Sequence, residues 1–182
     1  MSENRGMVRH IPNILTLLNL ACGSLAIYFI GFHEWMMVSL LIGIGGLADF
    51  LDGLVARALK VSSPIGAQLD SLADMISFGV APGLILFELL MLTQGGAQYR
   101  SAEYQSDHLL LALPALLFPI CAALRLARFN TEDDSSGDFK GLSTPAATAT
   151  VIGYVLVAVV NYFGVSYPPL YDPFPNQNAV YI

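Results

Sequence analysis

The sequence is poor in charged side chains, and this shortage is its first informative property. Asp, Glu, Lys and Arg together make up 12% of the 182 residues, whereas a soluble globular domain carries about 25%. Apolar residues supply 55% of the chain. The composition therefore argues against an ordinary soluble protein and indicates a membrane protein, which we predict to form a single transmembrane domain over residues 1–182.

Cysteine is also scarce. Cys22 and Cys121 each lie inside an apolar run, and neither belongs to a CxxC pair. We therefore predict two small buried hydrophobic side chains and no thiol chemistry. A cleaved signal peptide is excluded as well, because the first apolar run covers about 20 residues and a typical signal core has about 7–15.

Long apolar runs are what the chain has in abundance. A helix of about 20 apolar residues crosses a bilayer core of about 30 Å, and backbone groups in lipid must be satisfied within the segment. No strand-like alternation competes, so the runs predict helical spans. A mid-span group of small residues at positions 43, 45 and 46 predicts close helix packing rather than a nucleotide-binding loop. The predicted spans are Ile11–Ile30, Trp35–Leu51, Leu72–Leu92, Leu109–Leu126 and Ala146–Phe163.

The basic residues predict the orientation, since cytoplasmic loops are enriched in Lys and Arg. With a cytoplasmic N-terminus, only Arg100 of the eight basic residues lies on the far side. We therefore expect a multi-pass protein of the cell membrane whose N-terminus faces the cytoplasm. After the polar, Pro-rich stretch Tyr167–Asn178, the residues Ala179–Ile182 resemble the opening of a sixth span, so we expect the C-terminal span to be incomplete.

Four aspartates mark the candidate site. Asp49 and Asp52 are three residues apart, and Asp70 and Asp74 are four apart, so each pair lies on one helix face. The first pair ends the second span and the second pair begins the third. A short loop joins these spans, and we therefore expect all four carboxylates to converge at the cytoplasmic surface.

Such a convergence requires a counter-charge. A carboxylate at the centre of a membrane helix costs about 2.5–3.5 kcal/mol on insertion scales, and Arg57 can neutralise one of the four at most. Ion pairs at helix ends explain the cluster poorly because cations are too few. Oxygen ligands favour Mg²⁺ or Mn²⁺, and four carboxylates on two helices suit a two-metal site. Arg57 offers a guanidinium for phosphate oxygens, and glycine at positions 53 and 66 permits close approach of a ligand.

These residues together resemble the signature of the CDP-alcohol phosphatidyltransferase family. The resemblance implies an all-α membrane bundle of six helices that acts as a homodimer and transfers a phosphatidyl group from a CDP-linked lipid to an alcohol with release of CMP. It also implies that the four aspartates hold two divalent metals, that Asp74 doubles as general base, and that Gly53, Ala56, Arg57 and Gly66 line the CDP site. All eight fixed positions and their spacings match, namely Asp49, Asp52, Gly53, Ala56, Arg57, Gly66, Asp70 and Asp74.

The flanking segments bear on the acceptor alcohol. Residues 10–19, 63–79, 125–130 and 139–142 resemble the membrane-embedded branch of the family that joins CDP-diacylglycerol to L-serine, although Ser143 stands where we would expect proline. Arg125, Arg128 and Lys140 are candidates for the serine carboxylate, and ordinary cytoplasmic anchors are an equally good interpretation. Asn13 and Thr16 are candidates for nucleotide contacts or for polar helix packing.

Other functions remain open at this stage. Glycerol 3-phosphate is the next acceptor, which would give a phosphatidylglycerophosphate synthase, and inositol phosphate is the third. An ion-coupled transporter also buries acidic residues, but it places them near the midplane among internal repeats or broken helices. The aspartates lie at one face and no repeat is visible. We expect lipid partners and no nucleic acid.

Overall fold

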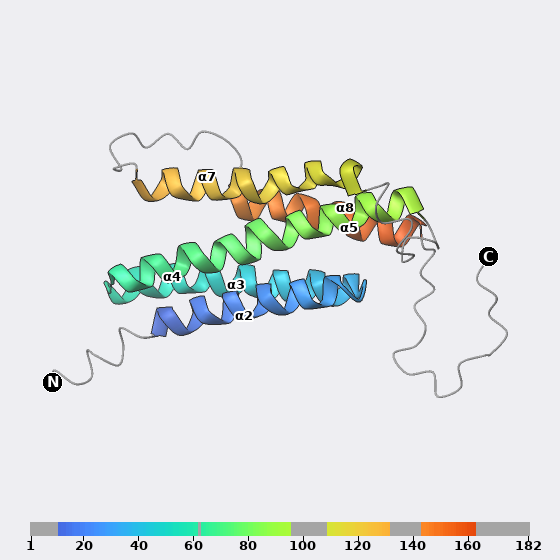
Figure 1. Ribbon diagram of the computed structural model, residues 1–182. Coiled ribbons are helices and arrows are strands. Elements are labelled where there is room, and N and C mark those ends of the chain that lie inside the picture. Colours follow the sequence, from blue (N-terminus) through green and yellow to red (C-terminus); the bar gives the residue numbers. More distant parts are fainter. Residues whose placement is uncertain (1–10, 62, 96–108, 132–142, 163–182) are drawn as a thin grey trace, which may run out of the picture.

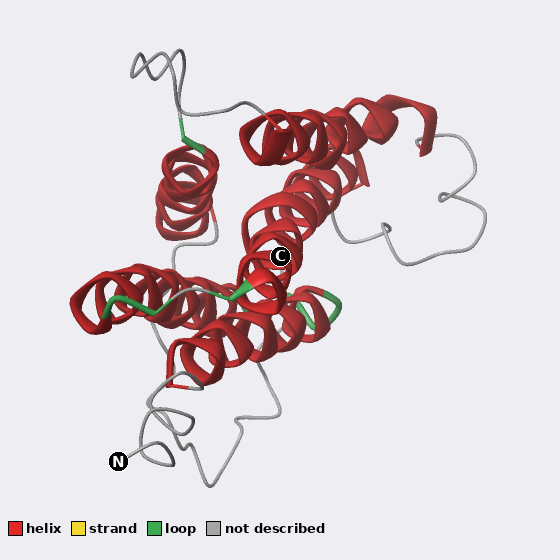
Figure 2. Cartoon of the chain, turned by 90° about the vertical axis from the view of Figure 1, so that its left-hand side faces the viewer, coloured by secondary structure: helices red, strands yellow, loops and turns green. Residues whose placement is uncertain are grey.

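The computed structural model describes residues 11–61, 63–95, 109–131 and 143–162, which are helical apart from short turns and contain no strand (Figures 1 and 2). The all-α prediction is confirmed. The elements, in chain order, are α2 (Ile11–Ile30), α3 (Trp35–Leu59), α4 (Pro64–Asp74), the π-helix η1 (Met75–Val80), α5 (Ala81–Gly95), the 3₁₀ turn η3 (Leu113–Leu116), α7 (Leu117–Thr131) and α8 (Thr144–Tyr162).

Four helical segments are long and apolar enough to cross a membrane: Pro12–Ile30, Trp35–Leu59, Pro64–Leu92 and Leu109–Thr131. A shorter apolar helix, Thr144–Ala158, corresponds to the fifth predicted span. The second span extends to Leu59 and not to Leu51, and the third begins at Pro64 and not at Leu72. The predicted end of the second span came too early, and the predicted start of the third came too late. In both places carboxylates interrupt the apolar run, whereas the helix continues through them.

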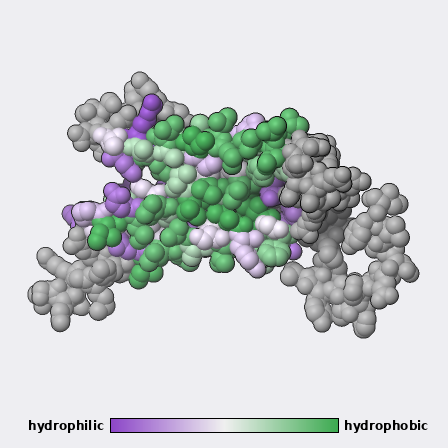
Figure 3. Space-filling view, in the orientation of Figure 1, coloured by the Kyte–Doolittle hydropathy of each residue, from purple (hydrophilic) through white to green (hydrophobic). Residues whose placement is uncertain are grey.

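Side-chain packing is that of a membrane bundle. The buried positions hold many small residues, such as Ala26, Ala48, Ala73 and Ala81, whereas large apolar residues such as Leu110 point outward. Hydrophobic residues cover the middle of the molecule in Figure 3, and hydrophilic ones gather toward its ends. In lipid, outward apolar side chains carry no penalty and small residues let helices approach closely. Cys22 is buried as predicted, but Cys121 is exposed on this outer surface, so that prediction is wrong.

Gly45 is a direct example of close packing. A Cβ atom at this position of α3 would lie 3.0 Å from Asn19 Oδ1 and 3.4 Å from Cys22 Cβ, both on α2. Gly43 differs, because a Cβ atom there would have no neighbour within 4 Å. The close-packing interpretation therefore holds for Gly45, whose absent side chain lets α2 and α3 run side by side (Figure 1).

The turn between α3 and α4 brings two helix ends together. Lys60 ends α3 in the left-handed conformation (φ 51°), and its backbone N–H returns to the helix. Ser63 then caps α4, because its hydroxyl accepts a hydrogen bond from the Gly66 backbone N–H at 2.9 Å, and Pro64 occupies the first helical position. The chain reverses within four residues, so the ends of α3 and α4 that carry aspartates lie at the same end of the bundle (Figure 1).

The helix beginning at Pro64 changes character directly after Asp74. Residues Met75–Val80 form a π-helix, which then continues as α5. From α8, the Thr148 hydroxyl donates to the Phe78 carbonyl at 2.9 Å, which supplies a partner to a carbonyl of the widened turn. π-Helical turns occur frequently at functional sites. This one adjoins the aspartate pair of α4.

Some sequence predictions lie outside the described residues. These are the Pro-rich stretch Tyr167–Asn178, the apolar residues Ala179–Ile182 and the basic residue Lys140.

Candidate functional site

Three of the four aspartates form a compact cluster. Carboxylate oxygens of Asp49 from α3 and of Asp70 and Asp74 from α4 all lie within 4.8 Å of one another. The i, i+4 spacing places the two α4 residues on one face, and the short turn brings Asp49 opposite them. These three side chains thus converge, as the spacing of the aspartates in the sequence predicted.

Asp52 lies beside this cluster and has a neutral partner. Its side chain is buried (6% exposed), and its Oδ2 accepts a hydrogen bond of 2.5 Å from the Thr16 hydroxyl of α2. The Pro12 carbonyl lies 3.1 Å from the same hydroxyl and is a second acceptor for its one hydrogen. Thr16 itself is 3% exposed. The sequence grouped Asp52 with the other three aspartates as a metal ligand; in the structure its described side-chain hydrogen bond is the one to Thr16 of α2.

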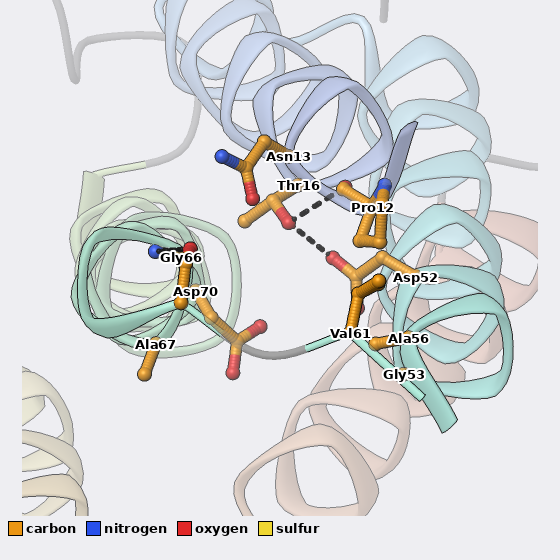
Figure 4. A pocket seen from close by; sticks show the side chains of 11 residues that line it. Pro12, Asn13, Thr16, Asp52, Gly53, Ala56, Val61, Gly66, Ala67 and Asp70 are labelled. Atoms are coloured by element: carbon orange, nitrogen blue, oxygen red, sulfur yellow. Dashed lines mark hydrogen bonds between the residues drawn. The ribbon is translucent and has the colours of Figure 1, made fainter. Parts of the chain in front are cut away.

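A cavity of about 210 Å³ opens between α2, α3 and α4. Figure 4 shows Asp52 and Asp70 pointing into it from opposite helices, with Asn13 and Thr16 on the α2 side. The cavity has both carboxylates and apolar walls, as a site for a polar head on an apolar tail requires. Its lining consists of Pro12, Asn13, Thr16, Asp52, Gly53, Ala56, Val61, Ser63, Gly66, Ala67 and Asp70.

Five of the six residues assigned to the nucleotide line this cavity: Asn13, Thr16, Gly53, Ala56 and Gly66. The sixth, Arg57, is exposed and is absent from the lining; its Nε donates to the Gly53 carbonyl at 3.0 Å. The guanidinium is therefore folded back along α3 in this structure.

Gly66 is required by its surroundings, which are tight. A Cβ atom there would lie 2.9 Å from Ser63 Oγ and 3.0 Å from Asn13 Oδ1. Any side chain would press on the cap of α4 and on the cavity wall at once. The glycine thus serves both the start of the helix and the shape of the cavity.

The basic residues assigned to the acceptor are less closely grouped. Arg125 lines a second cavity of about 460 Å³ between α5, α7 and α8, together with apolar residues such as Phe118. Arg128 is exposed in the last turn of α7. That turn is tied to α4, because Asn130 Nδ2 donates to Ser71 Oγ at 2.9 Å, one residue from Asp70.

The carboxylate cluster fits a divalent metal centre. Within the described part of the chain, none of the four aspartates forms a salt bridge with a basic side chain. Three carboxylates that converge without a cation repel one another, and a bound cation removes that repulsion. The donors are all oxygen, which matches the preference of Mg²⁺ and Mn²⁺. Asp49, Asp70 and Asp74 are therefore suitable ligands.

Two polar residues next to Asp74 were missed by sequence reasoning. Asn19 is fully buried and its Nδ2 donates to Asp74 Oδ1 at 3.4 Å, and the buried Ser77 hydroxyl donates to the Asn19 backbone carbonyl at 3.1 Å. A signal for Asn19 was present, because Asn13, Thr16 and Asn19 follow one another at intervals of three along an otherwise apolar helix. Ser77 had no comparable signal.

The fold and site define a multi-pass membrane protein with an acidic, metal-binding type of centre between its first helices. Comparison with known proteins gives the family: the CDP-alcohol phosphatidyltransferase family model matches residues 9–172. The chain belongs to this family. The transferase class expected from the aspartate motif is thereby confirmed.

Curated relatives carry the name CDP-diacylglycerol–serine O-phosphatidyltransferase. The Bacillus subtilis protein is 34% identical over 140 residues, which cover 77% of this chain and 72% of that protein. The Methanocaldococcus jannaschii protein is 31% identical over 186 residues, covering 94% of this chain and 78% of that protein. The Mycobacterium leprae protein is 34% identical over 161 residues, which are 85% of this chain but 48% of the longer protein. No solved structure matches the chain.

Proposed function

We propose that this chain transfers the phosphatidyl group of CDP-diacylglycerol to the hydroxyl of L-serine and releases CMP. The observation that carries the proposal is the cluster of Asp49, Asp70 and Asp74 beside a cavity that opens within the membrane-spanning helices. The family match and the printed names of the relatives support both the reaction class and the acceptor.

Different parts of the protein accommodate the polar head and the acyl chains of the donor. Asn13, Thr16, Gly53, Ala56 and Gly66 line the cavity that receives the CDP head, while apolar outer faces of the helices leave the acyl chains in lipid. Arg57 rotates away from the Gly53 carbonyl to meet phosphate oxygens, for which its planar fork is suited. Thr16 holds the carboxylate of Asp52 in place from α2.

Asp49, Asp52, Asp70 and Asp74 would hold two ions of Mg²⁺ or Mn²⁺, which when bound offset the charge of the diphosphate and of the departing CMP. Asp74 accepts the proton of the serine hydroxyl as the new O–P bond forms and the bond to CMP breaks. Asp74 is favoured for this role because it is the last residue of α4, one turn beyond Asp70, and the amide of Asn19 lies beside it.

The acceptor needs a cation for its carboxylate. Arg128 is favoured by the bond from Asn130 to Ser71, which brings the end of α7 beside the aspartates of α4. Arg125 faces the second cavity and Lys140 lies outside the described residues, so both are weaker candidates. Replacing the correct residue by glutamine raises the KM for serine and leaves the KM for CDP-diacylglycerol unchanged.

We further propose that the N-terminus and the site face the cytoplasm, that the protein resides in the cell membrane and that it works as a homodimer. The start of α2, the turn from α3 to α4 and the end of α7 lie at one end of the bundle (Figure 1). The four basic residues of the described chain, Arg57, Lys60, Arg125 and Arg128, all lie at the end of α3, in the turn after it or near the end of α7, in line with the enrichment of Lys and Arg on the cytoplasmic side. Light scattering in detergent tests the dimer.

The deciding experiment is an acceptor panel on purified protein in detergent micelles with CDP-diacylglycerol and Mn²⁺. CMP release is expected with L-serine and not with glycerol 3-phosphate or inositol phosphate, and Asp70→Asn serves as the inactive control. If glycerol 3-phosphate supports release and serine does not, the acceptor is wrong and the transferase class stands. Absence of CMP with every acceptor would refute the proposal as a whole.

A further inference from the structure

Asn19 of α2 has an unusual environment for an amide. Its side chain is fully buried, and its Nδ2 lies 3.4 Å from Asp74 Oδ1, to which it donates. Among the described residues, none forms a hydrogen bond with the amide oxygen, Oδ1. A buried amide that leaves one of its polar atoms unsatisfied costs about 1–3 kcal/mol. This cost falls on Asn19, whose side-chain amide donates to Asp74, the proposed base.

Two neighbouring helices fix how Asn19 is oriented. On α3, Gly45 provides the space for the amide oxygen, since a Cβ atom there would lie 3.0 Å from Oδ1. On η1, the Ser77 hydroxyl donates to the Asn19 backbone carbonyl at 3.1 Å. Ser77 in turn fits because Gly23 has no side chain; a Cβ atom at Gly23 would lie 2.9 Å from Ser77 Cα. Backbone and side chain of Asn19 are thus both held.

The amide can face Asp74 in one sense only. With Nδ2 toward the carboxylate, a donor meets an acceptor, whereas the reversed amide would place two acceptor oxygens against each other. The oxygen is therefore directed at the space left by Gly45. The unsatisfied oxygen is a consequence of directing the N–H groups at Asp74.

We propose that Asn19 is a positioning residue for Asp74: its amide holds one oxygen of that carboxylate so that the other is presented to the metal ions and to the acceptor hydroxyl. The inference rests on the proposed function, in which Asp74 is a metal ligand and the base. Partners that orient a metal ligand affect metal affinity or activity by about 10–100-fold when they are removed. Without Asn19, the Asp74 side chain is free to leave the cluster.

The test uses the full chain in detergent micelles and Mn²⁺ alone as the probe. Asn19→Leu removes the amide at nearly constant size, and electron paramagnetic resonance of free Mn²⁺ gives the dissociation constant. We expect about 10-fold weaker binding, with no fall in the metal-free unfolding temperature, because the variant also removes the unsatisfied amide oxygen. The matched control is Ser24→Ala on the same helix, whose hydroxyl is exposed and donates to the Leu20 carbonyl at 2.8 Å; it should bind Mn²⁺ as the wild type does.

Gly45→Ala is the second variant, because its methyl group displaces Asn19 from the opposite side without removing the amide. It should weaken Mn²⁺ binding in the same direction. Unchanged Mn²⁺ affinity in Asn19→Leu would overturn the inference alone. A fall in metal-free unfolding temperature that accompanies the loss of affinity, or failure of both variants to fold, would overturn it too, because Asn19 would then be structural. A wild-type protein that binds no Mn²⁺ would refute the metal assignment and the inference with it.

Discussion

The hydrogen bond between Thr16 and Asp52 offers a sharp test of how the cavity works. Thr16→Val replaces the hydroxyl by a methyl group of similar size, so it removes the bond without creating a void. The Thr16 side chain is 3% exposed and Asp52 is 6% exposed. The Asp52 carboxylate therefore loses a charge-assisted partner at a largely buried position.

The magnitude follows from the nature of this bond. Hydrogen bonds to charged groups contribute about 1.5–3 kcal/mol, and each 1.36 kcal/mol is a factor of ten. If the bond is fully maintained in the transition state, kcat/KM for CDP-diacylglycerol falls about 10- to 150-fold. Thr16→Ser keeps the hydroxyl and should stay within about 3-fold of the wild type, since it loses one methyl group.

The assay is CMP release at saturating serine over a range of CDP-diacylglycerol concentrations in mixed micelles. Thr150→Val is the matched control, because the exposed Thr150 hydroxyl donates to the Ala146 carbonyl of its own helix at 3.0 Å, and it should leave kcat/KM unchanged. Wild-type kinetics in Thr16→Val, measured alongside an inactive Asp52→Asn, would show that Asp52 needs no partner on α2 and refute the reasoning.

Three further predictions concern the metal, the cavity and the topology. EDTA should abolish CMP release, and Mg²⁺ or Mn²⁺ should restore it. Asp70→Asn should lower the rate of CMP release at least about 100-fold, because an amide cannot offset the metal charge. Full activity after thorough chelation would contradict the metal centre. Gly66→Ala should raise the KM for CDP-diacylglycerol, since its methyl group would lie 3.0 Å from Asn13 Oδ1. Gly43→Ala has open space around it and should leave this KM unchanged. Equal kinetics of the two variants would count against the cavity as the donor site. In a variant without native cysteines, a cysteine at position 62 should react with an impermeant maleimide from the cytoplasmic side of oriented vesicles, and labelling from outside alone would reverse the proposed orientation.

Much of the site was predictable because it is local in the sequence. The i, i+3 and i, i+4 spacings of the aspartates and the short turn after Lys60 determine which carboxylates share a face and that α3 and α4 are antiparallel. These features depend on helix geometry and on turn residues, both of which are written in neighbouring positions. The first span was located to the residue as well, since no charged side chain interrupts it between Ile11 and Ile30.

Contacts between helices were harder to predict from the sequence. That Thr16 would bond to Asp52, 36 residues away, depends on how α2 crosses α3, and that crossing depends on small residues such as Gly45. A sequence reveals that small residues permit close packing but not which rotation of the partner helix they select. The spacing of Asn19 from Thr16 indicated its face of α2, but its contact with Asp74 on another helix could not be predicted from the sequence.

The π-helix shows why the third span could not be read correctly as one regular helix. Each residue of an α-helix turns by about 100°, so one extra residue in a turn rotates everything beyond it by about that angle. Asp70 and Asp74 face α2 and α3 before η1, while Ala81 and Ile85 after it pack into the apolar core with Ala26 and Val38. Because the residues of η1 are nearly all apolar or small, hydropathy carries no trace of the break, and the polar bonds made by Ser77 and Thr148 stabilise it from α2 and α8. The span thus carries the acidic centre before the widened turn and part of the apolar core after it, and both parts pack against α2 and α3.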